Sequence, residues 1–186
     1  MTNRHHRVLT IPNLLSLMRL CMIPLFVWLY LQERYVQTAM MLVLSGLTDL
    51  ADGWYARRFH AVSDLGKALD PIADKLTQAA MLLCLTSNHP SLIVSLILLM
   101  LKEATAAISG LIVIRTTGSV PSAVWHGKVT TLMLYLLMLV HVLWKDIPTA
   151  LSNVLTGVCV AMMLLSMTLY ALKNARSIHA AGKGGS

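Results

Sequence analysis

Four aspartates stand out in an otherwise apolar sequence because their spacing could hold metal ions: Asp49, Asp52, Asp70 and Asp74. The first two are three residues apart and the last two are four apart, so in helices each pair projects from one face. A carboxylate at membrane depth is costly unless it meets a partner, a metal or water. Carboxylate oxygens suit Mg²⁺ or Mn²⁺, which also bind phosphates. We therefore predict two such cations, held by the four carboxylates and able to clamp a pyrophosphate.

Three small residues and an arginine lie among these acids. Gly53, Ala56 and Gly66 leave room for a ligand or a neighbouring helix to approach the backbone closely. Arg57, one helical turn beyond Gly53, could pair with a phosphate. Together with the acids, these residues predict a site for a phosphate-bearing substrate.

Apolar runs of membrane-spanning length must position these residues. Of the 186 residues, 56% are hydrophobic and only 12% are charged. Runs of roughly 20 apolar residues, separated by short polar breaks, are long enough to cross the hydrocarbon as helices. We predict an all-α polytopic membrane protein of one domain, residues 1–186, with residues 1–12 along the interface and residues 174–186 as a flexible tail. Its six transmembrane helices span about 13–32, 36–58, 68–87, 91–114, 124–144 and 148–172.

The distribution of lysine and arginine predicts the orientation in the membrane. One side of the predicted spans carries nine of these residues and the other only two, Arg34 and Lys145. Cytoplasmic loops are enriched in lysine and arginine, so both termini should be cytoplasmic, in a multi-pass protein of the cell membrane. The net charge of +7 does not indicate nucleic acid, because the basic residues flank the spans and form no run. Anionic lipid and phosphate-bearing substrates are the favoured partners. The nine residues are Arg4, Arg7, Arg57, Arg58, Lys67, Arg115, Lys173, Arg176 and Lys183.

The stretch from Asp49 to Asp74 resembles the complete signature of the CDP-alcohol phosphotransferases. All eight fixed positions of that signature are matched. The resemblance implies an enzyme that moves a phosphatidyl group from CDP-diacylglycerol to a polar alcohol in phospholipid biosynthesis. It also implies a homodimer in which six helices surround an active-site cavity open to the cytoplasm. The eight positions are Asp49, Asp52, Gly53, Ala56, Arg57, Gly66, Asp70 and Asp74.

The resemblance also implies roles for the signature residues. By similarity to the family, Asp49, Asp52 and Asp70 would bind the two cations, and Asp74 would be both a ligand and the catalytic base. The acceptor hydroxyl must lose its proton as it attacks phosphorus, and the charge that develops on the departing CMP must be neutralised. The residues that would contact the nucleotide are Asp49, Gly53, Ala56, Arg57 and Gly66.

A second resemblance, near the N-terminus, indicates the acceptor. Residues 11–19, IPNLLSLMR, followed by Pro24, resemble the start of bacterial phosphatidylglycerophosphate synthases and of the related cardiolipin synthases. Glycerol 3-phosphate is therefore the leading acceptor. Its phosphate needs basic groups nearby, and the candidates are Arg19, Lys102, Arg115 and Lys128.

Two positions depart from the pattern of those synthases. Residues 127–131, GKVTT, resemble part of a Gly-Lys-x-Lys-Thr segment, but Thr130 stands where the second lysine is expected. Lys102 followed by Glu103 stands where an Arg-Glu pair is usual. Both departures concern the residues that would meet the phosphate of the acceptor.

Other functions and simpler structural explanations remain open. Residues 46–53, GLTDLADG, also resemble the cardiolipin synthases of this fold, whose acceptor is phosphatidylglycerol; inositol phosphate and serine are further candidate acceptors. Carboxylates within membranes also occur in divalent-cation transporters, which have no need for the small residues and the arginine of the signature. Asp70 followed by Pro71 could merely begin a helix, and Asp52 could form a structural bridge to Arg57.

Overall fold

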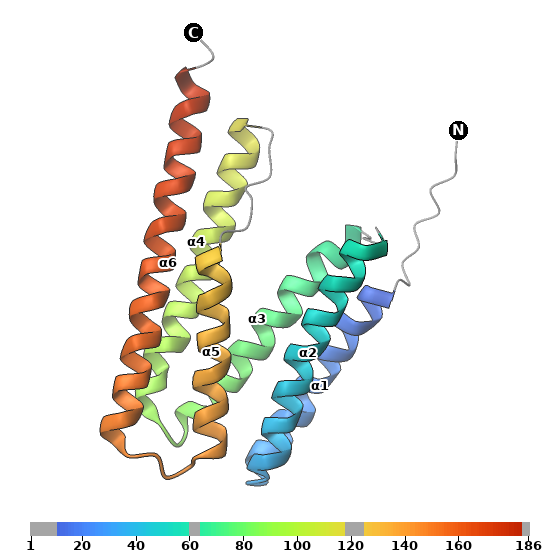
Figure 1. Cartoon of the computed structure of the whole chain (residues 1–186), viewed down its shortest axis with the longest axis vertical. Helices are drawn as coiled ribbons and strands as arrows, with labels where there is room; N and C mark the ends of the chain where they lie inside the picture. The colour runs from blue at the N-terminus through green and yellow to red at the C-terminus, as the bar shows by residue number, and fades with distance from the viewer. Residues whose placement is uncertain (1–10, 60–63, 118–124, 184–186) are drawn as a thin grey trace. The chain divides into compact units, whose positions relative to one another are not determined.

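The computed structural model describes residues 11–59, 64–117 and 125–183 (Figure 1). Side chains are described for residues 14–49, 71–116, 125 and 127–175. Every regular element in this part of the chain is helical, which confirms the predicted all-α fold. The elements are α1 (Ile11–Leu31), α2 (Tyr35–Phe59), α3 (Asp64–Thr86), a short 3₁₀ helix η1 (Pro90–Leu92), α4 (Ile93–Thr117), α5 (Trp125–Leu143) and α6 (Thr149–Lys183).

Two helix boundaries differ from the prediction. α3 begins at Asp64, an acidic residue that suits a helix N-terminus, so Pro71 lies inside the helix. The explanation in which Asp70 merely begins a helix is therefore wrong. Pro71 removes one N–H donor, a defect that helices in membranes tolerate. α6 continues to Lys183 because alanine, lysine and arginine favour helix, so residues 174–183 are helical where a flexible tail is predicted.

Three helical segments are long and apolar enough to cross a membrane: Leu14–Leu31, Pro90–Thr116 and Thr149–Ala175. Gly127–Leu143 is also apolar but shorter. Large hydrophobic side chains are exposed along all of these segments, which is the surface that lipid covers. The chain is therefore a membrane protein. In α2 and α3 the described side chains cover only residues 35–49 and 71–86, stretches too short for this comparison, so six crossings remain a prediction.

The contacts divide the chain into two units, and the first contains α1, α2 and α3 as far as Cys84. Glu33 adopts a left-handed conformation with φ of 56° in the turn between α1 and α2. The rings of Tyr30 and Tyr35 meet edge to face beside this turn, with centroids 5.7 Å apart. α2 then runs back along α1, so its C-terminal half, with the first signature residues, returns to the N-terminal half of α1. Most of the residues buried on these two helices recur at helical spacing; the buried set is Ser16, Arg19, Met22, Phe26, Leu29, Tyr30, Thr38, Ala39, Leu42 and Ser45.

The second unit begins at Leu85 and contains η1, α4, α5 as far as His141, and α6, with α4 lying along α6 (Figure 1). Asn174 of α6 donates a hydrogen bond from Nδ2 to Ser109 Oγ of α4, at 2.8 Å. On α5, a Cβ atom at Gly127 would lie only 3.0 Å from Tyr170 Oη, so the absence of a side chain lets the two helices approach closely. Small and polar residues therefore join α4, α5 and α6.

Candidate functional site

The signature residues lie at the end of α2 and the beginning of α3. Residues 60–63 connect the two helices, and so short a connection keeps those helix ends close together. The side chains of Asp49 and Asp74 are described, and the other six signature side chains lie outside the described residues. Their proposed roles as ligands and nucleotide contacts therefore remain predictions. The six are Asp52, Gly53, Ala56 and Arg57 on α2, and Gly66 and Asp70 on α3.

Asp49 is bound to an arginine from the neighbouring helix. Arg19 of α1 donates from Nη1 to Asp49 Oδ1 at 2.9 Å. The side chain of Arg19 is fully buried, whereas that of Asp49 is 38% exposed. A charge inside an apolar helix needs a partner of opposite sign, and Asp49 is such a partner for Arg19.

Asp74 is held by the residue one turn further along α3. Gln78 Nε2 donates to both carboxylate oxygens of Asp74, at 2.9 and 3.0 Å. Lys75 Nζ lies 3.2 Å from Asp74 Oδ2. Gln78 is completely buried, and its Oε1 has no hydrogen-bond partner among the described residues. The amide therefore fixes the orientation of the carboxylate that is predicted, from the family resemblance, to be the base.

The donors available at this site fit divalent cations that prefer oxygen. The predicted ligands are four carboxylates, without sulfur or imidazole, which is the set that Mg²⁺ and Mn²⁺ take. Asp49 is both anchored and partly exposed, as a ligand facing a solvated site must be. Over the described side chains, no three histidine, cysteine or acidic residues gather at one point, and two of the four predicted ligands lie outside that set.

The four basic residues proposed for the acceptor phosphate have different surroundings. Arg19 belongs to the first unit and is engaged with Asp49. Lys102 lies on α4 in the second unit, is only 8% exposed, and contacts Glu103 Oε1 from Nζ at 2.7 Å. Arg115, near the end of α4, and Lys128, near the start of α5, are exposed. Lys102 therefore differs from the last two in being a buried cation.

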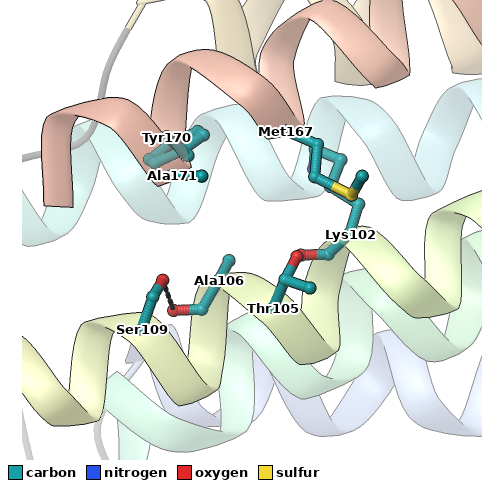
Figure 2. A pocket seen from close by; sticks show the side chains of 7 residues that line it. All are labelled: Lys102, Thr105, Ala106, Ser109, Met167, Tyr170 and Ala171. Atoms are coloured by element: carbon teal, nitrogen blue, oxygen red, sulfur yellow. Dashed lines mark hydrogen bonds between the residues drawn. The ribbon is translucent and has the colours of Figure 1, made fainter. Parts of the chain in front are cut away.

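Lys102 also lines a small cavity between α4 and α6 (Figure 2). The cavity holds about 60 Å³, which is room for roughly two water molecules or a group of similar size. Tyr170, which lines the cavity from α6, also lies against Gly127 of α5. The remaining lining residues are Thr105, Ala106 and Ser109 on α4, and Met167 and Ala171 on α6.

The sequence did not identify Gln78 as a partner of Asp74 or Arg19 as a partner of Asp49. Gln78 follows Asp74 by four residues, so helical spacing alone could have suggested it as a partner. Arg19 was considered only as an acceptor contact, although a charge within an apolar run signals a need for a partner. Its pairing with Asp49 depends on how α1 and α2 are rotated against each other, which no local pattern specifies.

Comparison with known proteins gives consistent similarities. The sequence model of the CDP-alcohol phosphatidyltransferase family matches residues 9–169. A protein of Aquifex aeolicus named CDP-diacylglycerol--glycerol-3-phosphate 3-phosphatidyltransferase is 32% identical over 176 residues, which cover 91% of this chain and 98% of that protein. A Bacillus subtilis protein of the same name is 31% identical over 137 residues, covering 65% and 70%. A Streptomyces coelicolor protein named cardiolipin synthase (CMP-forming) is 37% identical over 131 residues, covering 67% and 61%.

Proposed function

Because the chain belongs to the CDP-alcohol phosphatidyltransferase family, we propose that it transfers the phosphatidyl group of CDP-diacylglycerol to glycerol 3-phosphate. The products are phosphatidylglycerophosphate and CMP. The observation that carries this proposal is the similarity to the Aquifex protein, which extends over nearly the full length of both chains. The complete signature and the resemblance of residues 11–19 to phosphatidylglycerophosphate synthases support it.

In the proposed reaction a hydroxyl of glycerol 3-phosphate attacks the phosphorus that carries the diacylglycerol. A new P–O bond forms to the acceptor, the P–O bond to CMP breaks, and CMP leaves with the bonding electrons. Asp74 takes the proton of the attacking hydroxyl, with its carboxylate oriented by the amide of Gln78. The acyl chains stay in lipid, while the nucleotide lies at the solvated end of α2 and beginning of α3.

The other signature residues bind the donor in this proposal. Two Mg²⁺ or Mn²⁺ ions, when bound, neutralise the charge of the pyrophosphate and of the departing CMP. Asp49, Asp52, Asp70 and Asp74 would hold them. Asp49 would also contact the nucleotide, together with Gly53, Ala56, Arg57 and Gly66.

For the acceptor phosphate we propose Lys102, with Arg115 and Lys128 as further candidates. The burial of Lys102 beside a small cavity supports its role, because a partly desolvated ammonium attracts an anion more strongly than an exposed one. A homodimer, cytoplasmic termini and a cavity facing the cytoplasm complete the proposal and rest on the charge distribution and the family.

The experiment is a comparison of acceptors with one purified protein. CMP release is measured in detergent with CDP-diacylglycerol and Mg²⁺, while glycerol 3-phosphate, phosphatidylglycerol, inositol phosphate and serine are supplied separately. We expect release with glycerol 3-phosphate and none with the other three. The variant Asp74→Asn should remain folded and release no CMP with any acceptor. Near-normal turnover by that variant would show that Asp74 is not the base.

A second candidate function is that of a cardiolipin synthase, which takes phosphatidylglycerol as acceptor. The similarity to the Streptomyces protein and the 46–53 segment favour it, although that similarity covers less of both chains than the Aquifex one. CMP release with phosphatidylglycerol, and none with glycerol 3-phosphate, would establish a cardiolipin synthase in place of the proposed function.

A further inference from the structure

Arg19 is an unusual residue for its position in the chain. It lies within the apolar segment Leu14–Leu31, which is long enough to cross a membrane, and its side chain is fully buried. Ionised residues inside such segments face a partner or a cavity, because hydrocarbon cannot solvate them. The ion pair with Asp49 Oδ1, at 2.9 Å, supplies a partner of opposite charge from α2.

We propose that Arg19 is a positioning residue for Asp49, and that Asp49 is in turn the counterion that allows Arg19 to stay charged inside α1. This inference rests on the proposed function, since it is the signature that makes Asp49 a ligand for metal and nucleotide. The sequence suggested Arg19 as a contact for the acceptor phosphate, and the positioning role replaces that assignment. It acts on the reaction only through Asp49.

The rigidity of the contact supports this role. A guanidinium is a planar fork with its donors in fixed directions, and it stays charged at any pH the protein meets. Residues one turn to either side of Arg19 on the same face of α1, Ser16 and Met22, are buried as well. The arginine therefore cannot swing out of the interface between α1 and α2, and the carboxylate bound to it has one orientation.

The cation beside Asp74 provides a contrast within the same unit. Lys75 Nζ lies 3.2 Å from Asp74 Oδ2, but the lysine side chain is 28% exposed and has a flexible stem. It can leave the carboxylate when a metal ion binds. Arg19 has no such freedom, so Asp49 would bind metal with its arginine still attached. The cation bound to Asp49 is therefore buried, whereas the lysine beside Asp74 is partly exposed.

The first test measures the stability of metal-free protein and needs no substrate. Thermal unfolding midpoints are compared in chelator for the wild type, Asp49→Asn, Arg19→Met and the double variant. If Asp49 were only a metal ligand, removing one of several neighbouring carboxylates would leave the metal-free midpoint unchanged or raise it. We expect Asp49→Asn to lower the midpoint by on the order of 5–10 °C, because the buried Arg19 loses the carboxylate charge 2.9 Å from its Nη1.

The double variant and a matched control complete that test. Arg19→Met combined with Asp49→Asn should recover most of the lost midpoint, since both charges are gone. Asp146→Asn is the control, because it makes the same change at an exposed aspartate, and its midpoint should fall much less. An unchanged midpoint for Asp49→Asn, a double variant as low as the sum of the two single ones, or an equal fall for Asp146→Asn would overturn the proposal.

The second test distinguishes a positioning role from an acceptor contact. Arg19→Lys keeps the positive charge but removes the planar guanidinium that orients Asp49. We therefore expect Mn²⁺ binding, measured by calorimetry, to weaken by about 10- to 100-fold. The KM for glycerol 3-phosphate should stay within about twofold of the wild type, because the lysine touches no substrate. A large rise in this KM with unchanged Mn²⁺ binding would make Arg19 an acceptor contact. If the protein released no CMP with glycerol 3-phosphate, the proposed acceptor would be wrong. The unfolding midpoints and Mn²⁺ binding would still test whether Arg19 positions Asp49.

Discussion

Replacing Gln78 by leucine isolates the contribution of one hydrogen-bond donor to catalysis. Gln78 is completely buried, and its Nε2 donates to both carboxylate oxygens of Asp74, at 2.9 and 3.0 Å. A hydrogen bond to a charged group contributes about 1.5–3 kcal/mol. Since about 1.4 kcal/mol corresponds to a tenfold change in rate, kcat should fall by roughly 10- to 150-fold if the whole interaction is needed in the transition state.

The same substitution should have little effect on stability. Gln78 Oε1 is buried without a hydrogen-bond partner among the described residues, and such a group costs about 1–3 kcal/mol. Leucine removes that cost together with the favourable bond, and the two side chains have similar volumes. The two effects nearly cancel in the free energy of unfolding. A large loss of kcat in a protein that unfolds at almost the wild-type midpoint is therefore the expected result.

The assay is CMP release at saturating CDP-diacylglycerol, glycerol 3-phosphate and Mg²⁺, with the unfolding midpoint measured on the same samples. Thr77→Val is a matched control: Thr77 is buried beside Gln78, but its hydroxyl donates to the carbonyl of Ala73, at 2.9 Å, and not to Asp74. Its kcat should change by less than about twofold. Wild-type kcat in folded Gln78→Leu, or an equal loss in both variants, would refute the assigned role of the amide.

Three further predictions concern stability, pH and metal. Gly157→Ala should raise the free energy of unfolding by about 0.5–1 kcal/mol, because alanine favours the helix and its Cβ meets no atom within 4 Å. Gly127→Ala should lower the free energy of unfolding by about 1 kcal/mol, because its Cβ would lie only 3.0 Å from Tyr170 Oη. Denaturant unfolding of the two variants checks these opposite signs. Burial, and then the nearby His141, lower the pKa of His89, so the folded state favours the neutral imidazole. The stability contributed by neutral His89 is complete above the pKa of the unfolded state, about 6.5, and is lost as the pH falls toward the lower pKa of the folded state. The unfolding midpoint should therefore decrease below about pH 6.5, and it should decrease less steeply in His89→Gln. Finally, chelation should abolish CMP release and Mg²⁺ or Mn²⁺ should restore it, while full turnover in chelator would contradict the two-cation site.

Much of the fold follows from local patterns in the sequence. Four of the six predicted helices begin and end within three residues of those in the structure, because apolar runs and polar breaks are local signals. The start of α3 was misjudged because the prediction followed the apolar run, and the helix begins at Asp64, before that run. The end of α6 was misjudged because the apolar run stops well before the helix does.

The sequence proposes which residues form the candidate site, and these assignments remain predictions; it does not indicate how the described members are connected. The spacing of the acids placed Asp49 on one helix and Asp74 on the next, and the match of residues 9–169 to the family confirms the resemblance that the signature indicated. The contact of Gln78 with Asp74 follows helical spacing and was overlooked. The contact of Arg19 with Asp49 spans 30 residues and depends on tertiary packing, which sequence periodicity does not reveal.

The most direct measurement supplies CDP-diacylglycerol, isotope-labelled glycerol 3-phosphate and phosphatidylglycerol together to the purified protein, and identifies the lipid formed by mass spectrometry. Both acceptors then compete for one site under one condition. We predict labelled phosphatidylglycerophosphate in an amount equal to the CMP released, and no cardiolipin. Cardiolipin formed in an amount equal to the CMP, without label in any lipid, would contradict the proposed function and make phosphatidylglycerol the acceptor.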